Sequence, residues 1–309
     1  MRKAFTLIEL LIVIFITLLL LSILSSIYSG LFKKTSKQAT EYSHNFLDPV
    51  VLNILKQDIQ NAGLGLGENA ICICTNFICK DICLPIDYDK AKGGLVIRSV
   101  YNTTNQESRN YGIVSCNSTT SKPVLIFGNR TGSPVVYLDT SKHIIQGENG
   151  SLDKCPAPGN LLFFSYDKDV KTSGCINQFC NLIEYYLSTS SSDTLPFCAE
   201  GTHTLERRVG GNSTPFIPCV ADFKIRFNWE GKLVDPADLS NISLSEEKKK
   251  LKYVNVYLLV QASKREPNEV TSNATYSIDN LTLSLSNVTD YSHYKWKLFK
   301  LSVKPVNLE

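Results

Sequence analysis

The chain has 309 residues, of which 43% are hydrophobic and 20% are charged. These fractions are typical of globular proteins and exclude collagen-like, coiled-coil and low-complexity chains. With 32 basic and 29 acidic residues, the formal net charge is only +3. The chain therefore lacks the strongly basic character of nucleic-acid-binding proteins, and no nucleic-acid partner is predicted.

The amino terminus contains a long apolar run. From Leu10 to Phe32 the chain has 23 residues without a charge. A helix of that length, rising about 1.5 Å per residue, spans a hydrocarbon core of about 30 Å. A secretory signal has a shorter apolar stretch, of roughly 7–15 residues, followed by a small-residue cleavage site. The run therefore predicts a membrane-spanning helix, which we place at residues 5–32.

One acidic residue, Glu9, lies at the start of this region, in the sequence FTLIEL. A carboxylate at mid-membrane costs at least about 2.5–3.5 kcal/mol, so it is normally retained where a partner compensates it. FTLIEL and the short basic stretch before it resemble the type IV prepilin signature. In that family a prepilin peptidase cuts just before the Phe, which implies a leader of residues 1–4 and cleavage between Ala4 and Phe5. The family usually has Gly where this chain has Ala4, another small residue.

The resemblance also implies roles for the residues that follow the cut. The new amino terminus at Phe5 would be N-methylated, and its amine would pair with Glu9 of a neighbouring subunit in a filament. Two charges that are each costly in an apolar filament core become tolerable when they are paired. The competing interpretation is an ordinary single-span anchor with an isolated Glu.

The segment from Asn45 to Gly63 has the pattern of an amphipathic helix. Asp48 suits the N-cap, Pro49 suits the first helical position, and Gly63 suits a left-handed stop. Apolar residues at three and four residue spacing predict a stripe that faces a core, formed by Val51, Ile54, Leu55, Ile59 and Ala62. Residues 33–63 are thus predicted to extend the amino-terminal helix, and the sequence leaves open whether a kink at Pro49 interrupts it.

Beyond residue 90 the chain changes to a strand pattern. Segments rich in β-branched and aromatic residues are separated by Gly, Pro, Asn and Ser. These segments lie at 94–101, 123–127, 134–138, 160–166, 181–188, 222–229, 253–263, 276–286 and 294–306. Residues 240–252 are expected to form a loop or a short helix. Together the elements predict a pilin-like α+β fold, in which a long amino-terminal helix packs on a mostly antiparallel sheet in a head of residues 64–309.

All ten cysteines lie in the predicted head. Their even number favours disulfides in an exported chain, because an oxidising compartment preserves them. The candidates are Cys72, Cys74, Cys79, Cys83, Cys116, Cys155, Cys175, Cys180, Cys198 and Cys219. Cys175 with Cys180 and Cys198 with Cys219 are reasonable local pairs. The alternative for the first four, spaced C-x-C-x4-C-x3-C, is a metal site, although the usual C-x2-C pairs are missing.

Two further regions indicate a subtype within the resemblance. The phrase LKQDIQNAG at 55–63 resembles the end of the first helix in PilW-type minor pilins and GspJ-type pseudopilins. The segments 219–229, 251–266 and 296–308 resemble the closing strands of that family, with Pro305 where an Arg is common. The resemblance implies a non-enzymatic minor pilin that primes assembly of a type IV pilus or sits at its tip. The implied partners are other minor and major pilins, the prepilin peptidase and the inner-membrane assembly platform.

The resemblance places the subunit in the bacterial inner membrane with a periplasmic head before assembly, and outside the cell afterwards. One alternative is a type II secretion pseudopilin with the same anchor and fold. A role of the head in cell adhesion at the tip is compatible with the pilus subunit. A membrane-anchored monomeric binding protein or enzyme is an alternative of another class. The four histidines stand singly, and neither G-x-S-x-G nor G-x-x-x-x-G-K-[ST] occurs. The sequence therefore predicts no enzymatic activity, no cofactor and no metal site.

Overall fold

The computed structural model describes residues 49–65, 84–99, 111–119, 121–128, 135–139, 141, 144–145, 154–165, 181–188, 195–209, 212–239 and 242–308. The chain divides into two units, Met1–Pro49 and Val50–Glu309. Apart from Pro49, all the described residues belong to the second unit. The predicted leader and membrane helix, residues 1–4 and 5–32, lie outside the described residues.

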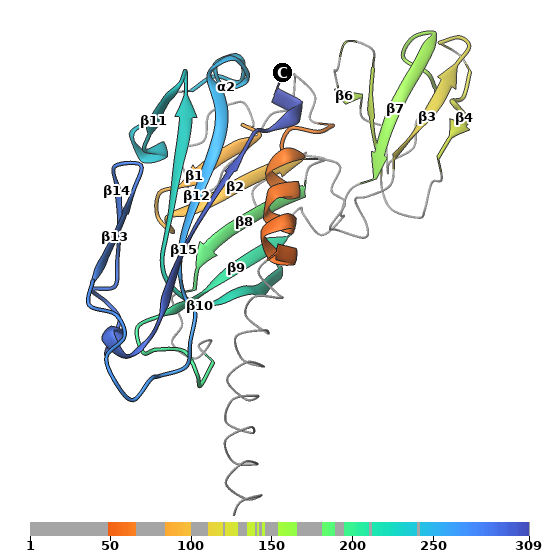
Figure 1. The fold of residues 1–309 in the computed structure, drawn as a ribbon. Coiled ribbons are helices and arrows are strands. Elements are labelled where there is room, and N and C mark those ends of the chain that lie inside the picture. Colours follow the sequence, from red (N-terminus) through yellow and green to blue (C-terminus); the bar gives the residue numbers. More distant parts are fainter. Residues whose placement is uncertain are drawn as a thin grey trace, which may run out of the picture. The chain divides into compact units, whose positions relative to one another are not determined.

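The largest element is an antiparallel sheet (Figure 1). In spatial order its strands are β1 (Ile86–Asp89), β2 (Gly94–Ser99), β8 (Asn181–Leu187), β9 (His203–Val209), β10 (Asn212–Trp229), β12 (Leu251–Gln261) and β15 (Trp296–Val303). A short strand, β11 (Lys232–Val234), also pairs with β10. Every pairing in this sheet is antiparallel. The mostly antiparallel sheet expected for the head is confirmed in the described residues.

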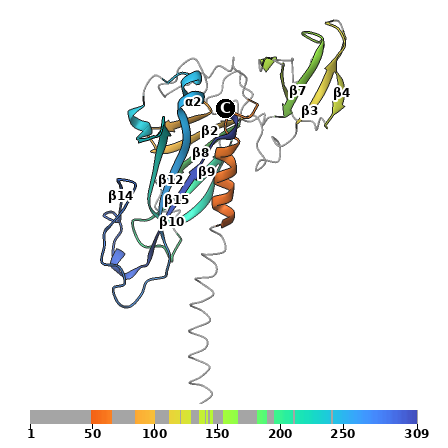
Figure 2. The same cartoon turned by 45° about the horizontal axis from the view of Figure 1, so that its top comes forward.

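A helical segment, residues 49–60, packs on one face of this sheet (Figures 1 and 2). Leu55, Ile59 and Ala62 are each at most 1% exposed and share one core with apolar residues of the central strands. Gly63 has a φ of 80°, the left-handed conformation that the sequence predicts for the helix stop. The predicted buried stripe is confirmed at these three positions, while the expected N-cap, Asp48, lies outside the described residues.

Alternation along the central strands decides which side chains face the helix. In β10, Phe223, Ile225 and Phe227 belong to the core that includes the helix residues, whereas Lys224 and Arg226 alternate with them. Successive side chains of a strand point to opposite faces. The helix therefore covers an apolar face, and the other face carries charged residues along part of its length.

A hairpin covers another part of that second face. It consists of β13 (Thr275–Ile278) and β14 (Leu281–Ser284), joined by Asp279 and Asn280. Both joining residues have positive φ, 52° and 58°, which is the pattern of a type I′ turn. Leu281 and Leu283 pack with Tyr257 and Leu259 of β12 in a second core. The buried residues of this core are Ala199, Ala221, Tyr257, Leu259, Leu281, Leu283, Leu285, Val288, Tyr294 and Trp296. The prediction of one continuous strand at 276–286 was wrong, because two polar residues that tolerate left-handed backbone reverse the chain.

A second, five-stranded sheet has the order β4, β3, β7, β5, β6. Its strands are β3 (Tyr111–Cys116), β4 (Val124–Phe127), β5 (Val135–Leu138), β6 (Ile144–Ile145) and β7 (Gly159–Ser165). One side is buried around Val114, Leu161 and Phe163. The edge strand β4 differs, because each of its four apolar residues is 45–59% exposed.

The remaining described elements are short. A helix, α2 (Leu244–Lys250), follows the N-cap Ser243, and three 3-10 turns lie at η4 (Pro236–Asp238), η5 (Tyr291–His293) and η6 (Val306–Leu308). Ser243 and Glu246 form a capping box, in which the N–H of Glu246 donates to Ser243 Oγ at 3.3 Å and the N–H of Ser243 donates to Glu246 Oε2 at 3.0 Å. Of the two expectations for residues 240–252, the short helix is therefore correct.

Sequence patterns missed several strands. β1, β3, β6, β9 and β11 were not predicted, nor was the first half of β10. β9 has the sequence HTLERRV, and its residues Glu206, Arg207 and Arg208 hide the strand pattern. Strand formation there depends on pairing with β8 and β10, which a local pattern does not report.

Candidate functional site

The residues that the sequence assigns to processing and assembly, Ala4, Phe5 and Glu9, lie outside the described residues. The described structure instead begins with the helical segment that follows the predicted anchor in the chain. Buried polar contacts fasten this segment to the large sheet.

A buried group of three polar side chains fastens the helix to the sheet. Asp58 of the helical segment has a fully buried side chain, and Arg207 of β9 donates from Nε to its Oδ2 at 2.8 Å. Tyr185 of β8 donates its hydroxyl to the same oxygen at 2.5 Å, and Arg207 Nε lies 3.1 Å from the Tyr185 hydroxyl. Paired strands place Tyr185 opposite Arg207. We call Asp58, Tyr185 and Arg207 the helix clamp.

The electrostatics of the helix clamp keep the hydroxyl of Tyr185 protonated. Burial, and then the nearby charge of Asp58, raise the pKa of Tyr185 well above its usual value. Tyr185 therefore remains a neutral hydrogen-bond donor. The clamp satisfies a buried carboxylate with a guanidinium and a hydroxyl, which is the condition for tolerating a charge in the interior.

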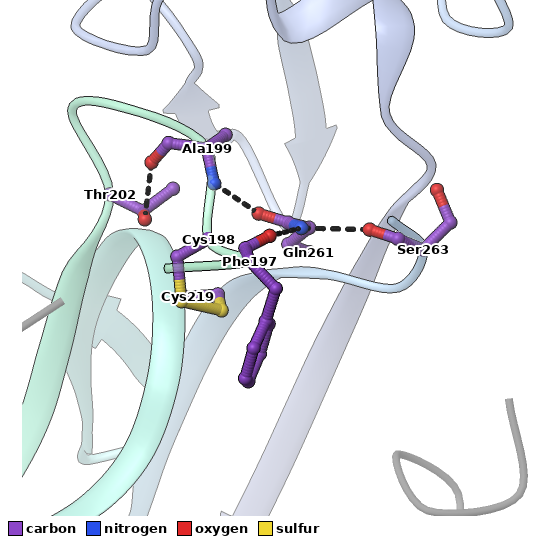
Figure 3. Close-up of a disulfide and its surroundings, with 7 residues drawn as sticks. All are labelled: Phe197, Cys198, Ala199, Thr202, Cys219, Gln261 and Ser263. Atoms are coloured by element: carbon purple, nitrogen blue, oxygen red, sulfur yellow. Dashed lines mark hydrogen bonds between the residues drawn. A yellow bond between two sulfur atoms is a disulfide. The ribbon is translucent and has the colours of Figure 1, made fainter. Parts of the chain in front are cut away.

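A disulfide and a buried amide hold the turn before β9 (Figure 3). Cys198 is bonded to Cys219 of β10, one of the two local pairs that the sequence analysis considered. Gln261, 1% exposed at the end of β12, accepts a hydrogen bond from Ala199 N at 2.7 Å. Its Nε2 donates to Phe197 O at 2.9 Å and to Ser263 O at 2.7 Å. One side chain thus satisfies three backbone groups around the disulfide.

A second disulfide joins Cys116 to Cys155 in the five-stranded sheet. The other six cysteine candidates, Cys72, Cys74, Cys79, Cys83, Cys175 and Cys180, lie outside the described residues. The pairing of Cys175 with Cys180 and the alternative of a metal at the first four therefore stay predictions. Within the described ranges, no group of three or more His, Cys, Asp or Glu residues is placed to hold a metal ion.

An open hollow near η5 is lined by Glu269, Thr271, Ser272, Val288, Asp290, Tyr291 and Ser292. Its two carboxylates already have partners, since Arg265 contacts Asp290 at 3.1 Å and Ser292 Oγ donates to Glu269 at 3.2 Å. The carboxylates that line this open hollow are therefore already engaged by neighbouring side chains.

The comparison with family models found a match at the amino terminus. Residues 1–25 match the model described as "Prokaryotic N-terminal methylation motif". This match supports a type IV pilin-like protein, of a pilus or of a pseudopilus. It is also consistent with a membrane-anchored precursor, although no helix in the described part of the chain is long and apolar enough to cross a bilayer. The searches of curated proteins and of solved structures found no match.

Sequence reasoning missed the helix clamp and Gln261. One signal for Asp58 was available, because it lies beside Ile59 and three residues after Leu55, on the apolar stripe of the helix. A charged residue at a predicted core position needs a buried partner. Nothing in the local sequence identified that partner as Arg207, which lies 149 residues later.

Proposed function

We propose that the protein is a minor pilin, a structural subunit that primes assembly of a type IV pilus or sits at its tip. The observation that carries the proposal is the methylation motif at residues 1–25 with Glu9 inside it. Prepilin peptidase cuts between Ala4 and Phe5, and the amine of Phe5 is methylated. In the filament this amine pairs with Glu9 of a neighbouring subunit, because each charge alone is costly in apolar surroundings.

The head supports a structural role in two ways. The helix clamp ties the helical segment 49–60 to the central strands, so a force on this segment is carried into the sheet. The two described disulfides then restrict the unfolded chain of a head that works outside the cell. The large head, residues 64–309, favours a minor subunit over a repeating shaft subunit. The partners on this proposal are major and minor pilins, the prepilin peptidase and the inner-membrane assembly platform.

The same motif supports a pseudopilin of a type II secretion system, which uses the same anchor and processing. Deleting the gene separates the two: loss of pili with normal protein secretion supports the pilus subunit, and the reverse supports the pseudopilin. A membrane-anchored monomeric binding protein or enzyme predicts neither defect.

Mass spectrometry of the amino-terminal peptide of the mature protein tests the proposal directly. We expect a peptide that begins at methylated Phe5. A mature chain that retains Met1, or that starts beyond Ser29, contradicts processing as a prepilin. Expression in cells that lack prepilin peptidase is the control, and the purified chain should then retain residues 1–4.

A further inference from the structure

The short helix α2 places one acidic side chain in the protein interior. Glu247 is 2% exposed, whereas the side chain of the preceding Glu246 is 45% exposed. Glu247 Oε1 accepts a hydrogen bond from the backbone N–H of Ile86 at 2.8 Å. Glu247 Oε2 is buried and has no hydrogen-bond partner within the described ranges. An unpaired hydroxyl costs far less to bury than an unpaired charge, so this geometry favours the neutral acid.

The hydrogen bond from Ile86 lies at the edge of the large sheet as far as the structure describes it. β1 ends the strand order of the described sheet. Arg98 N donates to Pro85 O at 2.8 Å, which makes Ile86 and its partner Ile97 a non-hydrogen-bonded pair. The N–H of Ile86 therefore points away from β2, toward the side where a further strand would add. The Glu247 carboxyl accepts the hydrogen bond from this N–H group and so covers the sheet edge at Ile86. A covered edge is protected from pairing with another chain.

Among the described residues, charged groups of β1, of β2 and of α2 itself act on the Glu247 carboxyl. Asp87 of β1 opposes ionisation, whereas Arg98 of β2 and Lys248 of α2 favour it. The Arg98 guanidinium is already engaged, because it donates to Leu84 O at 2.8 Å and to Asp87 Oδ2 at 3.3 Å. Burial is the largest influence and raises the pKa of Glu247 well above its usual value.

We propose that Glu247 is a neutral acid in the folded protein near pH 7 and forms a pH-sensitive latch that holds α2 over the edge of β1. In the neutral state Oε1 still accepts from Ile86 and no counter-charge is needed. Loss of the proton creates a buried negative charge, which water relieves when α2 leaves the sheet edge. The latch closes in acid and opens in base.

The direction of the pH dependence follows from proton linkage. In the closed state the carboxyl keeps a proton that it releases when α2 opens and the group enters water. Each opening event then releases one proton, so the population of the open form rises about tenfold per pH unit between the two pKa values. Stability of the closed form is complete below the pKa of the exposed acid and declines as the pH rises above it.

Infrared spectroscopy of the full chain in detergent micelles tests the protonation state. The variants are Glu247→Gln, which is close in shape to the neutral acid, and Glu200→Gln, the same change at an exposed carboxylate. At pH 7 the spectrum of the wild type minus that of Glu247→Gln should contain the carbonyl band of a protonated carboxylic acid. The difference with Glu200→Gln should lack it. Absence of the band from the first difference overturns the proposal.

Hydrogen exchange tests the latch itself. After correction for the intrinsic exchange rate, protection of Ile86–Asp89 and Leu244–Lys250 should fall about tenfold per pH unit, between the pKa of the exposed acid and that of the buried acid, in the wild type and in Glu200→Gln. In Glu247→Gln it should be independent of pH. Equal pH profiles in the wild type and Glu247→Gln overturn the proposal. Should Glu247→Gln fail to fold, the wild-type profile decides, and constant protection between pH 6 and 9 then counts against the latch.

Discussion

At the scale of single residues, the head depends on polar side chains buried among apolar ones. Asp58 lies on the same buried stripe of the helix as Leu55, Ile59 and Ala62, and its side chain is fully buried although it is acidic. A charge at such a position is tolerated because Arg207 and Tyr185 bind the same oxygen. We therefore expect the helix clamp to favour one placement of the helix on the sheet.

Replacing Arg207 with Met should therefore be strongly destabilising. The change leaves the Asp58 carboxylate buried without its counter-charge, and we expect a loss of about 3–5 kcal/mol in the free energy of unfolding. Tyr185→Phe removes a hydrogen bond and keeps the ion pair, so its cost should be nearer 1 kcal/mol. Urea titration of the full chain in detergent, followed by fluorescence of Trp229 and Trp296, measures both changes.

A double variant, Asp58→Leu with Arg207→Met, is the matched control. It removes both charges, so it should recover much of the loss caused by Arg207→Met alone. If the double variant is as unstable as the sum of its single variants, the two residues do not act as a pair.

At the scale of elements, short segments are stable where their ends are satisfied. α2 has only seven residues, too few for an isolated helix in water. Its capping box satisfies backbone donors at the start of the helix. The positive charges of Lys248, Lys249 and Lys250 interact favourably with the negative end of the helix dipole in the last turn. The helix also packs at the start of β12, so both local interactions and tertiary packing stabilise it.

Removing the cap tests this account. Ser243→Ala should cost about 1 kcal/mol, because the N–H of Glu246 loses its acceptor, whereas Ser243→Asp should keep the cap. The two variants are compared by urea unfolding at pH 7. Equal stability of Ser243→Ala and the wild type would show that packing alone maintains α2.

The same cap has a pH signature opposite to that of Glu247. Hydrogen bonds from Ser243, its backbone N–H first, lower the pKa of Glu246 below its ordinary value of 4.5. The stability that Glu246 contributes is therefore present above the pKa of the unfolded state and is lost as the pH falls through the lower folded value. In Glu246→Gln this loss in acid should disappear, which a series of urea titrations between pH 6 and 2 would detect.

The disulfide Cys198–Cys219 makes a further prediction at this scale. It closes a separation of 21 residues in sequence, so replacing both cysteines with Ser should cost about 3 kcal/mol by loop entropy. Cys116→Ser with Cys155→Ser is the control, because that disulfide lies in the other sheet. Hydrogen exchange should show lost protection in β9 and β10 for the first pair of changes and in β3 and β7 for the second. Loss of protection in the same strands for both pairs would contradict independent roles.

At the scale of the whole molecule, the proposed function requires a connection between the processed amino terminus and the head. Within the described part of the chain, the helix clamp joins the helical segment 49–60 to the strands β8 and β9 of the head. Glu9 supplies the first step in the proposal, by pairing with the amine of a neighbouring subunit.

Glu9→Ala should leave cleavage and membrane insertion nearly intact, because the residue acts after processing. Its incorporation into filaments should fall, since an amine in apolar surroundings would then lack its partner. Immunoblots of sheared filaments and of membranes measure the two quantities. Ala4→Phe is the complementary variant and should block cleavage itself. Normal incorporation of Glu9→Ala would refute the pairing model.

The amino-acid sequence alone was sufficient for features that depend on neighbours along the chain. The methylation motif is a contiguous signature at residues 1–25. The helix stripe and its stop at Gly63 follow from three and four residue spacing and from the left-handed backbone that Gly adopts without strain. Strands such as β12 were recognisable because apolar side chains run along most of their length.

Only the tertiary structure decided which distant residues meet. Asp58 and Arg207 are separated by 149 residues, and Glu247 and Ile86 by 161. The burial of Glu247 beside the exposed Glu246 is equally invisible in the sequence LSEEKKK. Such contacts form because strand pairing and helix packing close long loops, and their energies depend on burial that no local pattern encodes. The sequence therefore predicts the processing signal and the class of fold, and long-range packing determines the clamp and the latch.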